Sequence, residues 1–206
     1  MALIIVGGNS RNIGKTSIVA GLIAATPERN WTAFKVTQFG HGVCSADGKS
    51  CDCQAGDHLV AVSEEKSTTT GTDSSRYKAA GAQRSIWVRT RQGMLAEAMP
   101  KIRIEIATSE NNIIESNSIL RFLQPDLFIS VLDPAVADFK ASARYFLDRA
   151  DAILIPERSP VHQPNWSNVS SRLLRGKPVL PMRPPTYCTD EVVSFVVDRL
   201  FSPVLP

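Results

Sequence analysis

A glycine-rich stretch near the start of the 206-residue chain has the residues and the spacing for phosphate chemistry. It reads Gly-Gly-Asn-Ser-Arg-Asn-Ile-Gly-Lys-Thr-Ser over residues 7–17. A short apolar strand is expected before it, at Ala2–Val6, and an apolar helical stripe follows it, at Ile18, Val19, Leu22 and Ile23. This order of strand, turn, Gly-Lys-Thr and helix is typical of a phosphate-binding loop, in which backbone N–H groups hold phosphate oxygens.

Two side chains of this stretch have expected roles in catalysis. Lys15 would place its ammonium on the β- and γ-phosphates, and the Thr16 hydroxyl would bind Mg²⁺. The residues expected to bind the nucleotide are Gly8, Asn9, Asn12, Ile13, Gly14, Lys15, Thr16 and Ser17. The alternative is a structural turn that contains Lys-Thr by coincidence.

The stretch departs from the usual spacing G-x-x-x-x-G-K-[ST] at one position. That spacing asks for glycine at position 9, where this chain has Asn9. Asparagine enters positive-φ conformations more readily than other non-glycine residues. We therefore expect the turn to form with Asn9 in place of glycine.

Glu115 is the second candidate for a chemical role. It ends an expected apolar strand, Asn112–Glu115, in the region where phosphate-loop folds place an acid that orders Mg²⁺ or the attacking water. The alternative role is to cap the turn that follows. Asp133, at the end of a later strand, is a weaker candidate of the same kind and fits a turn residue better.

Three cysteines and two histidines gather in one polar segment. They are His41, Cys44, Cys51, Cys53 and His58. Thiolate and imidazole are ligands of Zn²⁺, so the segment is a candidate site for Zn²⁺ or another transition metal. The spacing matches no common zinc signature, and a redox pair or a polar loop with free thiols remains open.

Strand and helix patterns alternate along the chain. Strands are expected at Trp31–Val36, Ser85–Val88, Asn112–Glu115, Leu127–Leu132, Ala152–Ile155 and Pro178–Pro181. Helices are expected from a cap at Asp73 to about Gly81, from about Arg91 to Ala107 with a kink or break at Pro100, from near Asp138, from Trp166 to Gly176, and after a cap at Thr189. Residues 38–72 are expected to form a long loop. The pattern predicts one domain over residues 1–206, an α/β three-layer sandwich of the P-loop NTPase type with a mostly parallel sheet covered by helices on both faces.

Composition narrows the classes of protein that fit. The net charge is +3, hydrophobic residues make up 43% and charged residues 21%, which are values of a globular protein. Basic residues are spread along the chain, so we expect no nucleic-acid partner. No apolar run is long enough to span a membrane, and the first residues resemble no signal peptide. The expected compartment is the cytoplasm.

The order of these motifs resembles the MobB-type proteins, the adaptors of molybdopterin-guanine dinucleotide biosynthesis. The resemblance covers roughly residues 2–117 and lies in the phosphate loop, Lys35 with His41-Gly42, Asp73-Ser74-Ser75-Arg76 before Ala80-Gly81-Ala82, and Glu115 at a strand end. Glu115-Ser116-Asn117 is closer to the nickel-metallochaperone GTPases, relatives in the same broad class. Their guanine-reading Asn-Lys-x-Asp is absent, because the matching strand end reads Ile155-Pro156-Glu157-Arg158. ATP and GTP therefore both stay open.

The resemblance implies a slow NTPase that works as a switch or adaptor in cofactor or metal-centre biosynthesis. It implies Mg²⁺, ATP or GTP, a partner protein from cofactor biosynthesis or a metalloenzyme, and a homodimer. Two alternatives stay open. One is a metal-delivery chaperone that uses the Cys/His segment, and the other is a kinase or ligase akin to dethiobiotin synthetase, in which residues 38–72 bind the phosphoryl acceptor.

Overall fold

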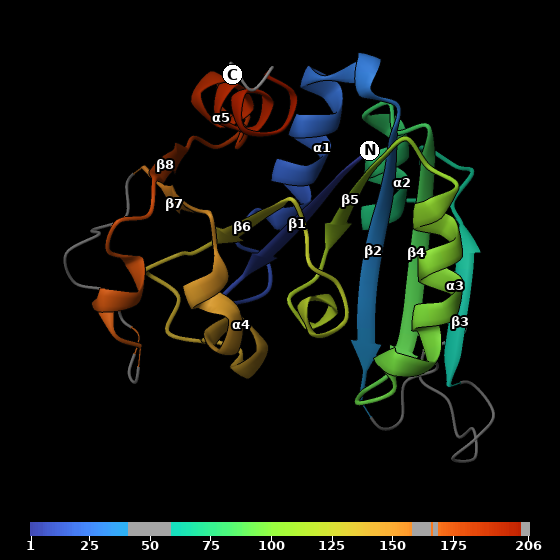
Figure 1. The fold of residues 1–206 in the computed structure, drawn as a ribbon, viewed down its shortest axis with the longest axis horizontal. Helices are drawn as coiled ribbons and strands as arrows, with labels where there is room; N and C mark the ends of the chain where they lie inside the picture. Colours follow the sequence, from blue (N-terminus) through green and yellow to red (C-terminus); the bar gives the residue numbers. More distant parts are fainter. Residues whose placement is uncertain (41–58, 158–165, 167–168, 203–206) are drawn as a thin grey trace.

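A single twisted sheet organises the molecule (Figure 1). The computed structural model describes residues 1–40, 59–157, 166 and 169–202. Within these residues the strand order is β3-β4-β2-β5-β1-β6-β7-β8. All neighbouring pairs are parallel except β3 and β4. The strands are β1 Ala2–Gly8, β2 Trp31–Phe39, β3 Val60–Glu64, β4 Arg84–Arg91, β5 Asn111–Glu115, β6 Leu127–Val131, β7 Ala152–Pro156 and β8 Val179–Met182.

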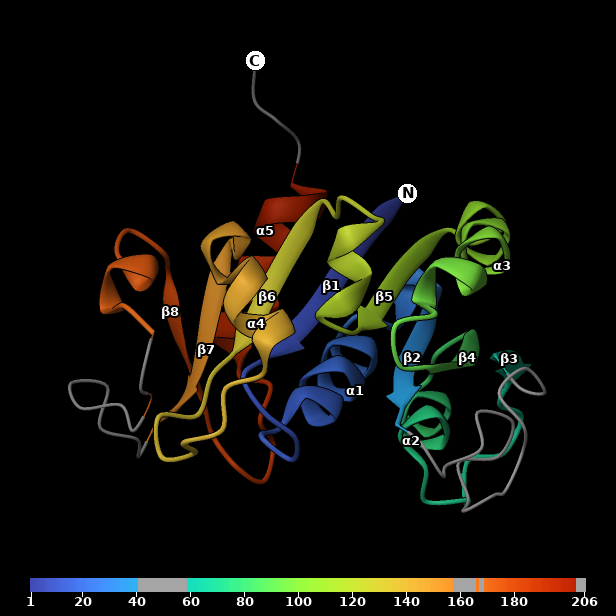
Figure 2. The same cartoon turned by 90° about the horizontal axis from the view of Figure 1, so that it is seen from below.

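Helices cover both faces of this sheet. They are α1 Lys15–Ala25, α2 Asp73–Ala79, α3 Leu95–Ala107, α4 Ala141–Phe146 and α5 Asp190–Phe201, with 3₁₀ turns η1 Pro27–Arg29, η2 Ser118–Arg121, η3 Leu147–Arg149 and η4 Ser171–Leu174. Figure 2 shows α1 and α2 on one side of the sheet and α3 on the other. None of the helices in the described residues is long and apolar enough to cross a membrane. The predicted α/β sandwich with a mostly parallel sheet is confirmed.

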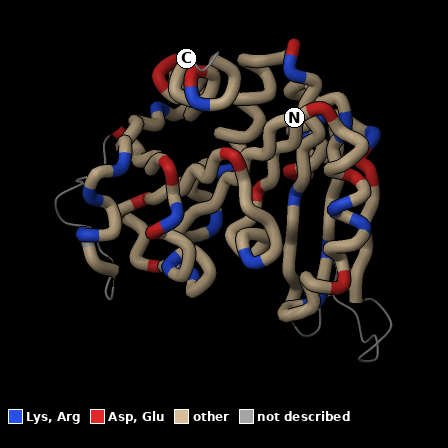
Figure 3. Tube along the Cα trace, in the orientation of Figure 1, with Lys and Arg blue, Asp and Glu red and all other residues tan. Residues whose placement is uncertain are grey.

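The alternation of side chains along each strand divides the core into two clusters. Ile4 and Val6 of β1 pack with α1, α2 and α5, whereas Ile5 between them packs with α3, α4 and η2. Strands buried on both faces read as nearly continuous apolar runs, and this explains Ile4–Val6 and Leu127–Val131, where the buried Ser130 is the one polar residue. Charged residues of the two signs are interspersed along the chain trace (Figure 3).

The expectation of one loop over residues 38–72 was wrong at its start and at residues 60–64. Strand β2 continues to Phe39, and Val60–Glu64 forms the edge strand β3. It pairs antiparallel to β4, with Val62 opposite Val88. The apolar run Leu59–Val62 is only four residues long and does not alternate with polar residues, so by itself it did not indicate a strand. Residues 41–58 lie outside the described part of the chain.

The helix expected over Trp166–Gly176 was also wrong. The described part of this segment contains only the 3₁₀ turn Ser171–Leu174. Serine and asparagine are frequent here, and such side chains compete for backbone groups outside helices. The Ser170 hydroxyl indeed accepts a hydrogen bond from the Arg172 N–H. The Trp166 indole instead donates to the carbonyls of Asp133 and Val136.

Helix starts were predicted less well than helix centres. Helix α3 begins at Leu95, because β4 runs on to Arg91, and it continues through Pro100. Helix α4 begins at Ala141, after the expected start near Asp138. The cap of α2 is Thr72, and Asp73 is the first helical residue. The expected cap of α5 is confirmed, since the Thr189 side chain accepts from the Val192 N–H.

Thr72 provides a test of this description, because its hydroxyl accepts a hydrogen bond from the Ser75 N–H at 3.1 Å. We predict that Thr72→Ala lowers the free energy of unfolding by about 1 kcal/mol, the usual effect of a lost N-cap. Thr72→Ser keeps the acceptor and is the matched control. Urea denaturation of the three proteins measures the effect, and equal stability of the Ala and Ser variants would contradict the assignment.

Candidate functional site

The loop between β1 and α1 turns through two residues with positive φ. These are Asn12, at φ 57°, and Gly14, at φ 97°. The expected turn forms with Asn9 in place of glycine, but Asn9 is not among the residues with positive φ, so the reason given for it was wrong. A Cβ on Gly14 would also lie 2.6 Å from Cδ1 of the Tyr187 ring, so glycine is required there.

Asn9 has another role, because its side chain is fully buried and fixes a second segment. Its Oδ1 accepts from the Asp133 N–H at 3.0 Å, and its Nδ2 donates to the Asp138 carbonyl at 3.1 Å. Its backbone carbonyl accepts from the Lys140 N–H at 2.8 Å. The Ser10 hydroxyl adds a bond of 2.6 Å to the Asp138 carboxylate. The loop between β1 and α1 and residues 133–140 are therefore held together as one unit.

A second side-chain amide holds the start of the loop. Asn117, just before η2, accepts from the Gly8 N–H through Oδ1 and donates to the Gly8 carbonyl through Nδ2, both at 2.9 Å. A Cβ on Gly7 would lie 2.1 Å from that Oδ1, so the close approach needs glycine. The Gly8 N–H is consequently engaged by the protein itself, as is the Asn9 N–H, which donates to the Val131 carbonyl.

Glu115 is the centre of a buried cluster at the carboxyl end of β5. Its side chain is 4% exposed. Its Oε2 accepts from the Thr16 hydroxyl at 2.8 Å and from the Tyr77 hydroxyl. Its Oε1 accepts from Lys35 Nζ at 2.6 Å. The carboxylate thus joins α1, α2 and β2 at one point.

Lys35 links this carboxylate to a second one. Its Nζ lies 2.6 Å from Glu115 and 2.6 Å from Asp73, the first residue of α2. Burial by itself would raise the pKa of Asp73, but the hydrogen bond and charge of Lys35 outweigh it and the pKa is lowered. Burial and the adjacent Glu115 raise the pKa of Tyr77 well above its ordinary value, so Tyr77 acts as a donor.

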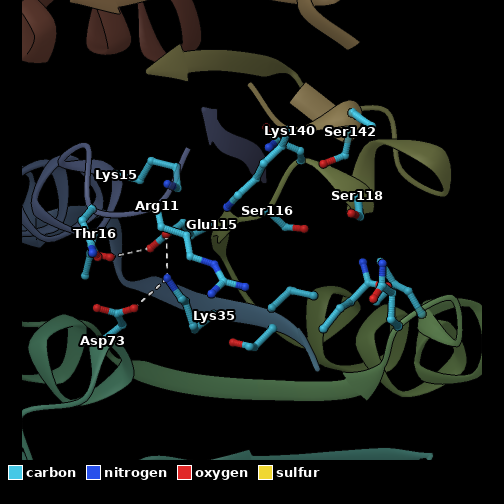
Figure 4. Close-up of a pocket in the computed structure, with 18 of the residues that line it drawn as sticks. Arg11, Lys15, Thr16, Lys35, Asp73, Glu115, Ser116, Ser118, Lys140 and Ser142 are labelled. Carbon is cyan, nitrogen blue, oxygen red and sulfur yellow. Dashed lines mark hydrogen bonds and ion pairs between the residues drawn. The ribbon is translucent and has the colours of Figure 1, made fainter. Parts of the chain in front are cut away.

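A cavity of about 1150 Å³ opens beside the loop and Glu115. Figure 4 shows its labelled side chains pointing into a shared space. Of the residues expected to bind nucleotide, Asn12, Gly14, Lys15, Thr16 and Ser17 line it, and Gly8, Asn9 and Ile13 are buried behind it. Its basic lining residues are Arg11, Lys15, Lys35, Arg76, Arg121 and Lys140, against the acidic Asp73 and Glu115. The cavity therefore carries an excess of positive charge.

Lys15 is held inside this cavity by the loop. Its Nζ donates to the Ser10 carbonyl at 2.5 Å. Burial lowers the pKa of Lys15 to about 8, and the charge of Glu115 only partly opposes that shift. The ammonium is thus poorly solvated in the protein alone, which favours its pairing with an anion.

The oxygen donors near Glu115 fit Mg²⁺. This ion prefers oxygen ligands and is usually held by one or two carboxylates with phosphate and water. The Thr16 hydroxyl and the Glu115 carboxylate are in contact, and Lys35 bridges Glu115 to Asp73. In the described residues no group of three or more His, Cys, Asp or Glu is placed to hold a metal ion. The candidate ligands His41, Cys44, Cys51, Cys53 and His58 lie outside those residues.

Several residues of the site were assigned no chemical role from the motifs. Lys35 is the register partner of Glu115 in the pairing of β2 with β5, and a lone charge within an apolar strand was its signal. Tyr77 lies one helical turn after Asp73, on the same face of α2. Asn117 and Lys140 follow strand ends, and nothing in their spacing marked them.

Comparison with known proteins identifies the fold. No family model matches the chain, and no curated protein matches it. HypB from Helicobacter pylori, solved in complex with nickel, is similar at a TM-score of 0.50 and 14% identity, over 95% of this chain and 86% of that one. The structure of LpxK from Aquifex aeolicus with ATP gives a TM-score of 0.46 and 17% identity, over 87% and 53%.

The fold class follows from the sheet order, the loop between β1 and α1, and the likeness to HypB. The protein has the α/β fold of P-loop NTPases. At this level of identity the likeness describes the fold alone.

The buried ammonium of Lys15 gives a pH-dependent prediction. The pKa of Lys15 is about 8 in the folded protein and 10.5 for an ordinary lysine, so between these values the folded state binds fewer protons than the unfolded state. The free energy of unfolding therefore rises with pH from 8 to 10.5, by up to about 3 kcal/mol. Urea denaturation of the ligand-free protein at pH 7.5 and 9.5 should show this rise in the wild type relative to Lys15→Met. A difference between the two proteins that does not change with pH would contradict it.

Proposed function

We propose that the cavity binds a Mg²⁺-bound nucleoside triphosphate, ATP or GTP, and that the protein hydrolyses it slowly and works as a switch. The observation that carries this proposal is the contact of 2.8 Å between the Thr16 hydroxyl and the Glu115 carboxylate. It brings the first turn of α1 to the acid at the end of β5. Phosphate-loop proteins need that pairing of hydroxyl and acid beside the terminal phosphate.

Backbone groups at the start of α1 support phosphate binding. The first bond within the helix runs from the Ile18 N–H to the Gly14 carbonyl at 2.9 Å. The N–H groups of Lys15, Thr16 and Ser17 consequently have no acceptor inside the helix. These three residues line the cavity, and the helix dipole favours an anion at the same end. Lys15 can exchange the Ser10 carbonyl for a phosphate oxygen.

Glu115 fits the role of an orienting acid. Thr16 and Tyr77 both donate to Oε2, whereas Oε1 accepts only from Lys35 among the described residues. A carboxylate oxygen has two acceptor positions, so Oε1 can hold one water molecule. Mg²⁺, when bound, would supply neutralisation of the developing phosphate charge. Thr16 and Glu115 would hold it, and Asp73 provides a further carboxylate nearby.

The resemblance of residues 2–117 to MobB-type proteins supports a role as an adaptor in cofactor or metal-centre biosynthesis, with a partner protein and a homodimer. Metal delivery through the Cys/His segment and phosphoryl transfer to a small molecule use the same triphosphate site. Phosphate release without any added acceptor supports hydrolysis, and release that requires a small molecule supports transfer.

Removal of the Lys15 ammonium tests the triphosphate site. We predict that Lys15→Ala weakens binding of the Mg²⁺-triphosphate by about a hundredfold, the effect of one preorganised charge of the order of 3 kcal/mol. Lys101→Ala, which removes one exposed charge from α3, is the control. Isothermal titration calorimetry measures both. Wild-type affinity and turnover in Lys15→Ala would reject the phosphate-loop assignment.

The Glu115 charge tests hydrolysis separately from binding. We predict that Glu115→Gln keeps triphosphate affinity within about threefold and loses at least about tenfold in turnover, because ordering of metal or water needs the charge. The amide brings donors against Thr16 and Tyr77, so the folded fraction is checked by circular dichroism. Tyr77→Phe, which keeps the carboxylate, is the control for a local packing change. A wild-type rate in Glu115→Gln would leave only the turn-capping role.

A further inference from the structure

We propose that Lys140 is a second phosphate-binding lysine, which contacts the terminal phosphoryl group from the segment before α4 that is hydrogen-bonded to the loop. The inference rests on the proposed triphosphate site. It adds a residue that belongs neither to the glycine-rich motif nor to the segment that resembles MobB. It also gives a reason for asparagine at position 9.

Lys140 lies where it can reach the proposed phosphates. It immediately precedes α4 and lines the same cavity as Lys15 and Glu115. In Figure 4 its side chain extends toward Glu115, and Arg11 reaches into the same space from the loop. Lys35 and Lys15 complete the group of cations around Glu115. This is the end of the cavity where the terminal phosphoryl group would lie next to Thr16.

The Lys140 ammonium is half-buried and belongs to no ion pair among the described residues. Among the described residues no carboxylate lies within ion-pair distance of it, whereas Lys35 contacts two carboxylates. Burial, followed by the charge of Arg11, lowers the pKa of Lys140. The Lys140 charge also contributes to the lowered pKa of Lys15, so the two ammonium groups sense each other. An anion placed between them would relieve both costs.

The nearest acid on the same segment, Asp138, is engaged by the loop, and its charge opposes the lowering of the Lys140 pKa only in part. Asp138 accepts a hydrogen bond of 2.6 Å from the Ser10 hydroxyl. Its backbone carbonyl accepts from Asn9 Nδ2, and the Lys140 N–H donates to the Asn9 carbonyl. The loop thus fixes Asp138 and the Lys140 backbone together and leaves the Lys140 side chain for a ligand.

Asn9 is accordingly a positioning residue. Glycine at position 9 would offer no side-chain amide, and the Asp133 N–H and Asp138 carbonyl would each lose a buried partner. The chain between β6 and α4 would then be tied to the loop by fewer bonds. Asparagine at this position couples Lys140 to the phosphate loop.

The position of Lys140 predicts discrimination between nucleotides. A group that contacts the terminal phosphoryl affects a triphosphate and has little to contact in a diphosphate. We expect Lys140→Gln to weaken a non-hydrolysable Mg²⁺-triphosphate by about tenfold to a hundredfold, the effect of one charged hydrogen bond. Affinity for the matching diphosphate should change by less than about threefold.

The experiment is calorimetric titration of wild type, Lys140→Gln, Lys140→Arg and Lys101→Gln with both nucleotides, with melting temperatures measured in parallel. Lys101→Gln controls for net charge, and Lys140→Arg should recover part of the triphosphate affinity. The Lys140 side chain donates to no described protein group and its buried charge costs stability, so Lys140→Gln is expected to melt no lower than the wild type. Equal losses for the two nucleotides, or no loss, would overturn the assignment of Lys140.

A double-mutant cycle tests the coupling to Asn9. If Asn9 acts through Lys140, the triphosphate effects of Asn9→Gly and Lys140→Gln are less than additive. Additive effects would reject the positioning role, and if Asn9→Gly does not fold, the Lys140 titrations decide the inference alone. A wild type that binds neither nucleotide would instead reject the proposed function. A wild type that binds both, with no selective loss in Lys140→Gln, would reject Lys140 only.

Discussion

The buried carboxylate of Glu115 is the interaction on which the site depends. A carboxylate that is 4% exposed is costly unless donors surround it, and loss of one partner from a buried ion pair costs about 3–5 kcal/mol. Parallel pairing supplies these donors, because β5 lies between β1 and β2 and its last residue aligns with Val6 and Lys35. Tyr77 and Thr16 then reach the same carboxylate from α2 and α1. One acid therefore fixes the relative positions of two strands and two helices around the cavity.

The loop between β1 and α1 is fixed by hydrogen bonds on its buried side, whereas its other side faces the open cavity. Asn117 engages both backbone groups of Gly8, and Asn9 engages the segment after β6. The loop residues next to these two side-chain amides are buried. The residues from Asn12 to Ser17, apart from Ile13, line the cavity. Because the buried side of the loop makes hydrogen bonds within the protein, the N–H groups that face the cavity are in place before a ligand binds. That preorganisation lowers the entropy lost on binding.

The sequence predicted the parts of the fold that local chemistry determines. The strand, the glycine turn and the helix over residues 2–25 depend on neighbours in sequence, as does the cap at Thr189. The edge strand Val60–Glu64 could not be recognised, because its stability comes from the pairing with β4. For the helix expected from Trp166, long-range contacts act against the predicted element instead of creating one. Its apolar spacing was present, but the Trp166 indole bonds to carbonyls of residues far away in sequence.

The residues of the site also divide into those whose roles follow from the local sequence and those whose roles depend on long-range contacts. This division explains why the conformation of Asn9 was predicted wrongly. Lys15, Thr16 and Glu115 stand at positions where a motif or a strand end assigns the role. The roles of Lys35, Tyr77 and Asn117 arise only where strands and helices meet. Asn9 shows the difference, since a local argument predicted a positive φ, whereas long-range hydrogen bonds to Asp133 and Asp138 decide its conformation. In this loop the asparagine at positive φ is Asn12, which is exposed and whose side chain makes no such hydrogen bond among the described residues.

The electrostatics of the cavity explain why a protein would keep such an arrangement. Lys35 bridges the two acids that line the cavity, and the basic lining residues together outnumber those acids, which leaves a surplus of positive charge. The lowered pKa values of Lys15 and Lys140 show that burial makes this surplus costly in the protein alone. The cost is a loss of stability that a bound polyanion reverses, because it returns counter-charge to both ammonium groups. Sites that hold unpaired charges in place for a ligand lose stability and gain affinity in this way. Here the charges are those of Lys15 and Lys140, on two segments that Asn9 links.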